Sequence, residues 1–206
     1  KGEADILIGT QMVTKGLDFE NVTLVGVLSA DQVLYSDDFR SNERGFDLMT
    51  QVVGRSGRGT KRGRAIIQTY TPENPVIALA SHQDYVHFYQ QEILFRKAML
   101  YPPFADIVVI GFVGEQESKV AKASQLFLEM LSHLASKEYS ELPIRALRPT
   151  PAQVAKVSNK YRYKLMIKCK NNLTFRTMLS RLLVACGKEK AFAGVTVYAD
   201  SNPDMI

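Results

Sequence analysis

The first third of the chain carries short apolar runs separated by polar segments. These runs, at residues 5–9, 22–28 and 65–70, are rich in β-branched side chains. They are typical of strands that are buried on both faces of a parallel sheet. Between the second and third runs, apolar residues recur at helical spacing over 43–54 and predict a helix. Three strands and one helix do not complete a doubly wound α/β domain, so we expect further elements upstream of Lys1.

A longer helical pattern follows and ends at a pair of prolines. Apolar and aromatic residues mix over 75–101, and Pro102 and Pro103 cannot continue a helix. We therefore expect a domain boundary after Phe104. The expected parts are residues 1–74, a helical connector at 75–104 and a C-terminal domain at 105–206.

The rest of the chain alternates between strand-like and helix-like patterns. Residues 118–136 and 173–186 place apolar side chains on one stripe of a helix. Gly187 is expected to follow the second helix as its C′ residue. The pattern predicts a β-α-β-β-α-β order, a split βαβ domain of two layers with both helices on one face of the sheet. The four strands are expected at 106–113, 144–147, 161–169 and 195–199.

The composition is that of a globular protein with one or two domains. The 206 residues are 46% hydrophobic and 23% charged, which excludes a wholly disordered chain. Cys169 and Cys186 are too few for a zinc cluster and are expected to be buried, reduced thiols. The three histidines are scattered, so no metal site is expected. No apolar run reaches about 18 residues, so no membrane span is expected either.

Charge is distributed unevenly along the chain. Residues 1–104 contain 11 basic and 12 acidic residues, whereas residues 105–206 contain 15 and 9. From Leu142 to Lys188 there are eleven basic residues and no acidic one. This asymmetry favours a polyanionic partner for the second half.

Within that stretch, the strand expected at 161–169 alternates basic with apolar side chains. At period two, one face is basic apart from Met166, and the other is apolar or aromatic. We expect the apolar face to pack on helices and the basic face to lie open to water or to a phosphate backbone. The alternative is a solvated face with no partner. The candidate nucleic-acid-binding residues are Arg162, Lys164, Lys168 and Lys170 on the strand, with Arg148 and Lys156 before it.

Two polar motifs in the first third carry candidate chemistry. The first, Gly9–Phe19, reads GTQMVTKGLDF and follows an apolar run. Its Gly-Thr pair can bring backbone N–H groups and a hydroxyl against a phosphate. Gly16 permits a positive φ, and Asp18 can accept hydrogen bonds from a sugar hydroxyl or a cationic side chain. The alternative is an ordinary polar loop.

The second motif, Gln51–Gly59, ends the helix predicted at 43–54. It places Arg55 and Arg58 three positions apart among three glycines. An arginine can direct its planar fork at a γ-phosphate and stabilise charge that develops there. The alternative is an exposed basic turn between a helix and a strand.

Together, the two motifs resemble motifs V and VI of the superfamily 2 helicases, which form the second half of the second RecA-like lobe. The segments Asp38–Arg44, Tyr101–Phe104 and Tyr161–Leu165 are similar to the PriA family of bacterial replication-restart helicases, primosomal protein N′. The resemblance covers essentially the whole chain. It implies that residues 1–74 are half of a RecA-like lobe. It also implies an ATP-dependent DNA helicase that recognises stalled or branched forks and restarts replication by primosome assembly.

The resemblance implies roles for single residues. Arg55 and Arg58 would be catalytic arginine fingers on the ATP γ-phosphate, and Gln51 would sit near the nucleotide. The remaining implied roles are a DNA phosphate contact for Thr10, and coupling of nucleotide to DNA at the lobe interface for Gly16 and Asp18.

Parts of such a motor are missing from this sequence. It has neither a GxxxxGK[ST] loop nor a DExH box, and it lacks the paired cysteines of the family's zinc-binding insertion. By the resemblance, ATP and Mg²⁺ are held mainly by the first lobe and zinc by that insertion, both upstream of Lys1. This chain alone is expected neither to hydrolyse ATP nor to unwind DNA.

The implied partners are branched forks, single-stranded DNA, single-stranded DNA-binding protein and other primosome proteins, in the bacterial cytoplasm at the nucleoid. Two other functions stay open. A self-contained nucleic-acid-binding adaptor would use Arg55 and Arg58 on nucleic acid and need no ATP. An RNA helicase of the same superfamily would share motifs V and VI, although the similarity of the downstream domain argues against it.

Overall fold

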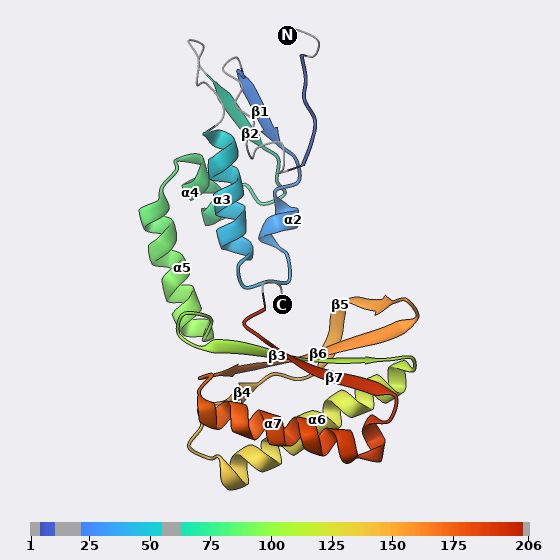
Figure 1. The fold of residues 1–206 in the computed structure, drawn as a ribbon. Coiled ribbons are helices and arrows are strands. Elements are labelled where there is room, and N and C mark those ends of the chain that lie inside the picture. The colour runs from blue at the N-terminus through green and yellow to red at the C-terminus, as the bar shows by residue number, and fades with distance from the viewer. Residues whose placement is uncertain (1–4, 11–21, 55–62, 204–206) are drawn as a thin grey trace. The chain divides into compact units, whose positions relative to one another are not determined.

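The chain divides into two units, residues 1–94 and 95–206. The structure, a computed structural model, describes residues 5–10, 22–54 and 63–203 (Figure 1). The division falls inside helix α5 (Tyr85–Met99). Both units mix helices with strands, as the α/β pattern of the sequence predicts.

The first unit contains a parallel pair of strands. Strand β1 (Leu24–Val27) pairs with β2 (Arg64–Ile67) in parallel register. Helix α3 (Ser41–Val53) contacts both strands, and alternate residues of each strand are half-buried. The other residues of each strand are exposed, and Leu24 and Ile66 are more than half exposed. The expectation that these strands are buried on both faces is therefore wrong, because among the described residues a helix packs on one face of the pair only.

Residues 5–10 contain no strand, although the apolar run at 5–9 predicts one. Ile6 and Ile8 are 80% and 85% exposed. A strand needs a neighbouring backbone to accept and donate its hydrogen bonds. In the described part of the chain, β1 and β2 pair only with each other, so this run has no strand beside it.

The helical pattern at 75–101 forms two helices rather than one. Helix α4 (Pro75–Ser81) ends before Gln83, which has a positive φ of 54°. Asp84 then caps the N-terminus of α5, because its carboxylate accepts a hydrogen bond from the backbone N–H of His87. The apolar spacing continues across this break, and for that reason the pattern alone predicts a single helix.

A small core holds these helices together. Phe46 of α3 stacks on Phe88 of α5, with ring centroids 4.1 Å apart and planes inclined by 9°. The short helix α2 (Asp31–Leu34) and α4 add Leu34 and Ala80 to the same cluster. Other buried members are Ala30, Met49, Val76 and Ile77.

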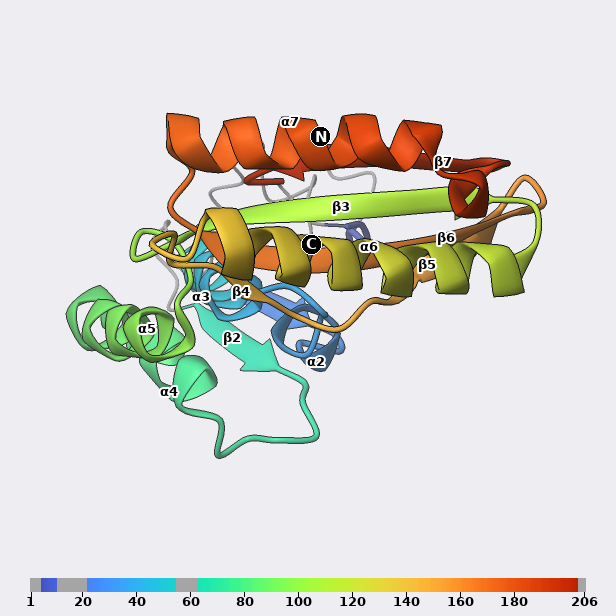
Figure 2. The same cartoon turned by 90° about the horizontal axis from the view of Figure 1, so that it is seen from below.

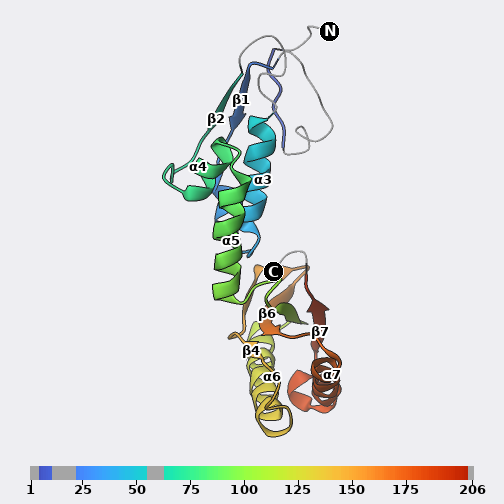
Figure 3. The ribbon, with the colours of Figure 1, turned by 90° about the vertical axis from the view of Figure 1, so that its left-hand side faces the viewer.

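The second unit is an antiparallel sheet with two helices on one face (Figures 2 and 3). The strand order is β4-β6-β3-β7, and β5 also pairs with β6. Every neighbouring pair is antiparallel. The strands are β3 (Asp106–Gly114), β4 (Arg145–Ala146), β5 (Thr150–Val157), β6 (Lys160–Cys169) and β7 (Val195–Ser201). The helices are α6 (Glu117–Glu138) and α7 (Leu173–Lys188), followed by the short 3₁₀ helix η1 (Lys190–Phe192).

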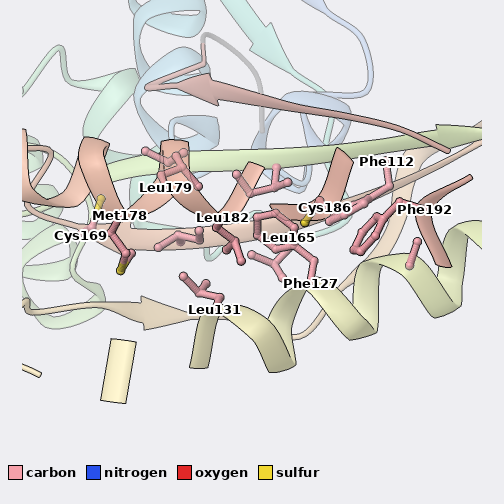
Figure 4. Close-up of a cluster of buried hydrophobic side chains, with 14 of the residues drawn as sticks. Phe112, Phe127, Leu131, Leu165, Cys169, Met178, Leu179, Leu182, Cys186 and Phe192 are labelled. Atoms are coloured by element: carbon pink, nitrogen blue, oxygen red, sulfur yellow. The ribbon is translucent and has the colours of Figure 1, made fainter. Parts of the chain in front are cut away.

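Aromatic and branched side chains fill the space between the sheet and the helices (Figure 4). Phe112 of β3 and Phe127 of α6 meet edge to face, with centroids 5.5 Å apart. Cys169 and Cys186 are both free and buried in this unit, as predicted. Burial raises the pKa of the Cys169 thiol to about 12 and that of Cys186 to about 11, so both thiols stay protonated near neutral pH.

Two local features differ from the sequence pattern. Gly187 is not a C′ residue, because α7 continues to Lys188 and is followed by Glu189 in extended backbone. Strand β5 is an additional strand that the pattern does not predict. It turns back into β6 through Ser158 and Asn159, whose φ angles of 48° and 62° are those of a two-residue primed hairpin turn.

Candidate nucleic-acid interface

The two faces of β6 have different surroundings. Leu165 and Ile167 are fully buried against the helices. Successive side chains of a strand point to opposite faces, so Arg162 and Lys164 lie on the face without helices. Both are half-buried. This open face carries the basic side chains that the alternation of the sequence predicts.

Strand pairing determines which residues lie beside these cations. Lys164 lies opposite Gly111 of β3 on one side and Thr150 of β5 on the other. Arg162 lies opposite Val113. Adjacent strands are about 4.8 Å apart, so these positions form rows across the open face.

Tyr198 of β7 completes the row of Lys164 and Gly111. Its Cα pairs with that of Gly111. A methyl group added at Gly111 would collide with ring atoms of Tyr198, so the ring lies directly over the glycine. The side chain is nevertheless 42% exposed. Sequence reasoning missed Tyr198 because the short run at 195–199 gives no sign of which residue it pairs with.

Lys168 is not on the exposed part of this face, and its predicted open position is wrong. It is only 6% exposed. Its Nζ donates a hydrogen bond to the carbonyl oxygen of Met99 at 2.6 Å and lies 3.7 Å from the centroid of the Tyr101 ring. Burial, with a smaller contribution from Arg145, lowers its pKa. Met99 at the end of α5 and Tyr101 just after it cover this end of β6 and shield Lys168 from solvent.

The remaining predicted cations of this unit are exposed. Lys170 follows β6, and Arg148 lies between β4 and β5. Lys156 of β5 is held by Tyr161, with its Nζ 4.7 Å from the ring centroid and 3.4 Å from the hydroxyl oxygen. Without Lys168, the predicted cations therefore lie on β6, on β5 and in the segments just before β5 and just after β6.

A family model for the primosomal protein N C-terminal domain matches residues 97–203. The chain belongs to this family. The matched span contains every strand and helix from β3 to β7, so the sheet and its open face lie within the primosomal protein N C-terminal domain.

Relatives of longer length match beyond that domain. The chain is 41% identical over all 206 residues to the replication restart protein PriA of Bacillus subtilis and 40% identical over all 206 residues to that of Synechocystis. It is 42% identical over 178 residues, 86% of the chain, to that of Chlamydia muridarum. The chain spans about a quarter of the length of these curated relatives, 25%, 23% and 23% in turn.

The sites expected in the first unit are described only in part. Gln51 lies in the last turn of α3 and is half-buried, and Thr10 is exposed. Arg55, Arg58, Gly16 and Asp18 lie outside the described residues.

The described residues contain neither a candidate metal cluster nor a membrane-spanning helix. In residues 5–10, 22–54 and 63–203, no group of three or more His, Cys, Asp or Glu side chains is placed to hold a metal ion. Over the same ranges, no helix has the length and apolar character needed to cross a bilayer.

Proposed function

We propose that this chain is the C-terminal part of an ATP-dependent DNA helicase that recognises stalled or branched replication forks and restarts replication by primosome assembly. The observation that carries the proposal is 40–41% identity over all 206 residues to proteins named replication restart protein PriA. The chain spans only about a quarter of those proteins, so helicase activity would require other parts of a longer protein.

In this proposal the first unit is the second half of a RecA-like lobe. The parallel pairing of β1 and β2 and the helix α3 between them in sequence support this assignment. Arg55 and Arg58 follow that helix directly and would act as arginine fingers on the γ-phosphate, with Gln51 near the nucleotide. ATP and Mg²⁺ would be held mainly by another lobe, and zinc by a segment outside this chain. Thr10 would contact the DNA strand, and Gly16 and Asp18 would couple the nucleotide to the DNA at the lobe interface.

The second unit would bind DNA through the open face of its sheet. Its strand order and the placement of both helices on one face support a split βαβ domain. Arg162 and Lys164 on β6, with the exposed Arg148, Lys156 and Lys170, would contact phosphates. Phosphate contacts carry affinity with little sequence information, so this face suits recognition of DNA by charge and shape.

The proposed partners follow from the same assignment. They are branched and single-stranded DNA, single-stranded DNA-binding protein and other primosome proteins. The setting would be the bacterial cytoplasm, at the nucleoid.

The DNA-binding role is tested by reversing charge on the open face. We expect the 206-residue chain to bind a forked duplex, measured by fluorescence anisotropy, with an affinity that falls as salt increases. Arg162→Glu with Lys164→Glu should remove most of this binding and reduce the salt dependence, because each lost phosphate contact lowers the salt slope by about one.

The matched control is Lys119→Glu with Lys122→Glu. These lysines are exposed on α6, in the helical layer, and the double variant changes net charge by the same amount. It should keep most of the binding. Equal losses in both double variants would mean that net charge alone drives association, and that the open face is not the binding site.

A further inference from the structure

The open face of the second unit contains an aromatic ring held flat among basic residues. Tyr198 lies over Gly111, and Lys164 is the next residue in the same row. The glycine leaves room for the ring to lie against the backbone of β3, so one ring face rests on the sheet. The side chain remains 42% exposed, so the other ring face is accessible.

We propose that Tyr198 is a stacking platform for a base of single-stranded nucleic acid. The proposal rests on the nucleic-acid function proposed for this face and specifies how one nucleotide is held there. Every base has a π-face, so an aromatic side chain binds bases with little sequence preference when nearby cations hold the backbone. An open antiparallel sheet backed by helices binds single-stranded RNA in this way. A paired duplex hides the faces of its bases, so the same ring favours single strands.

The charges around Tyr198 indicate where the phosphate backbone lies. Arg162 and Lys164 on β6 offer positive charge on one side of the ring. Asp200, two residues further along β7 on the same face, offers negative charge. Thr196 is the remaining β7 neighbour on this face and is uncharged. The backbone of a bound strand therefore crosses β6 near Arg162 and Lys164 and avoids Asp200.

Four variants separate stacking from charge and from folding. Tyr198→Leu keeps an apolar side chain but removes the π-face, whereas Tyr198→Phe keeps the ring. Gly111→Ala displaces the ring without changing Tyr198, because the added methyl group occupies the place of the ring. Tyr198→Trp introduces a reporter, since the sequence contains no tryptophan.

The probes are a fluorescein-labelled oligodeoxythymidylate of about 12 nucleotides, the length range of a single-strand site, and an abasic strand of the same length. On the 206-residue chain, Tyr198→Leu should weaken binding of the thymidylate strand by roughly 5- to 150-fold, the effect of losing one stacked base. Binding of the abasic strand should change by less than about twofold, because its phosphates still meet Arg162 and Lys164. Tyr198→Phe should bind both strands like the unaltered chain.

The two remaining variants check the position of the ring. Gly111→Ala should behave like Tyr198→Leu on both strands. The fluorescence of Tyr198→Trp should be quenched by the thymidylate strand and not by the abasic one. A thermal melt followed by circular dichroism identifies any variant that fails to fold, and Tyr198→Phe and Tyr198→Trp still test the proposal in that case.

Two results would overturn the stacking proposal. One is equal binding of thymidylate and abasic strands by the unaltered chain. The other is a Tyr198→Leu protein that binds thymidylate normally. If Arg162→Glu with Lys164→Glu still abolishes binding in either case, the proposed function of the face stands and only the stacking role fails. Binding that is insensitive to that charge reversal would contradict both the proposed function of the face and the stacking role of Tyr198.

Discussion

At the scale of single residues, the position of Lys168 shows how a lysine can be part of a core. Its side chain is almost wholly removed from water, which disfavours the charged form and lowers its pKa. The Met99 carbonyl accepts its hydrogen bond, and the face of Tyr101 attracts the cation. These contacts join the end of α5 and the residue Tyr101 to β6 within the second unit. Lys168 therefore contributes to the stability of the second unit and not to binding on the open face.

We predict that Lys168→Glu destabilises the second unit by about 3 kcal/mol or more, because it buries a carboxylate against a carbonyl oxygen. Lys168→Met should cost about 1–2 kcal/mol, since it removes the hydrogen bond to Met99 and the cation–π contact with Tyr101 but buries no new charge. Urea unfolding followed by far-UV circular dichroism measures both. The control is Lys170→Glu at an exposed position. A Lys168→Glu protein as stable as this control would contradict the structural role.

The lowered pKa of Lys168 also has a pH consequence. The unfolded chain binds this proton more tightly than the folded chain does. The contribution of Lys168 to the free energy of unfolding therefore increases as pH rises toward the ordinary lysine pKa of about 10.4. The Lys168→Met protein should lack this gain.

At the scale of elements, the break between α4 and α5 depends on one capping residue. Asp84 accepts hydrogen bonds from the backbone N–H of His87 at 3.2 Å and from its imidazole at 2.6 Å. These two bonds lower the pKa of the Asp84 carboxyl. The cap fixes where α5 starts and so places Phe88 against Phe46 in the core of the first unit.

We predict that Asp84→Ala lowers the midpoint of thermal unfolding by a few degrees, as expected for loss of an N-cap. Glu73→Ala removes the same charge at an exposed position and should leave the midpoint nearly unchanged. The pKa of Asp84 is lower in the folded state, so its contribution is present above its unfolded pKa and is lost as pH falls. The difference between the Asp84→Ala and unaltered proteins should therefore shrink in acid, measured by melts across a pH series. A difference that persists in acid would exclude a charged cap.

At the scale of the whole molecule, the proposed motor function requires parts that this chain does not contain. The chain spans about a quarter of the length of its curated relatives. The contacts proposed for this chain reach the nucleotide from one side only. An arginine finger stabilises charge that develops during phosphoryl transfer and contributes little to holding the ground-state nucleotide.

In the longer protein, we predict that Arg55→Ala or Arg58→Ala lowers DNA-stimulated ATP hydrolysis by roughly 10³- to 10⁵-fold and leaves ATP binding largely intact. Phosphate release and nucleotide titration measure the two effects. Lys61→Ala is the control, because it removes a positive charge from the same basic segment. Near-normal hydrolysis in either arginine variant would exclude that residue as a finger.

The sequence by itself determined the elements that face a large core. Apolar spacing placed β3, β6, α6 and α7 close to their observed bounds, because a side chain must return to the same face at the period of its helix or strand. The motifs and wider similarity pointed to the family that the residue 97–203 match shows. Periodicity also predicted the buried cysteines.

Tertiary structure alone decided the features that depend on which segments meet. The run at 5–9 forms no strand without a neighbouring backbone, and Lys168 is buried because Met99 and Tyr101 cover it. Tyr198 lies flat because its strand pairs in register with Gly111. Such outcomes follow from contacts between residues far apart in the chain, and local periodicity carries no information about those contacts.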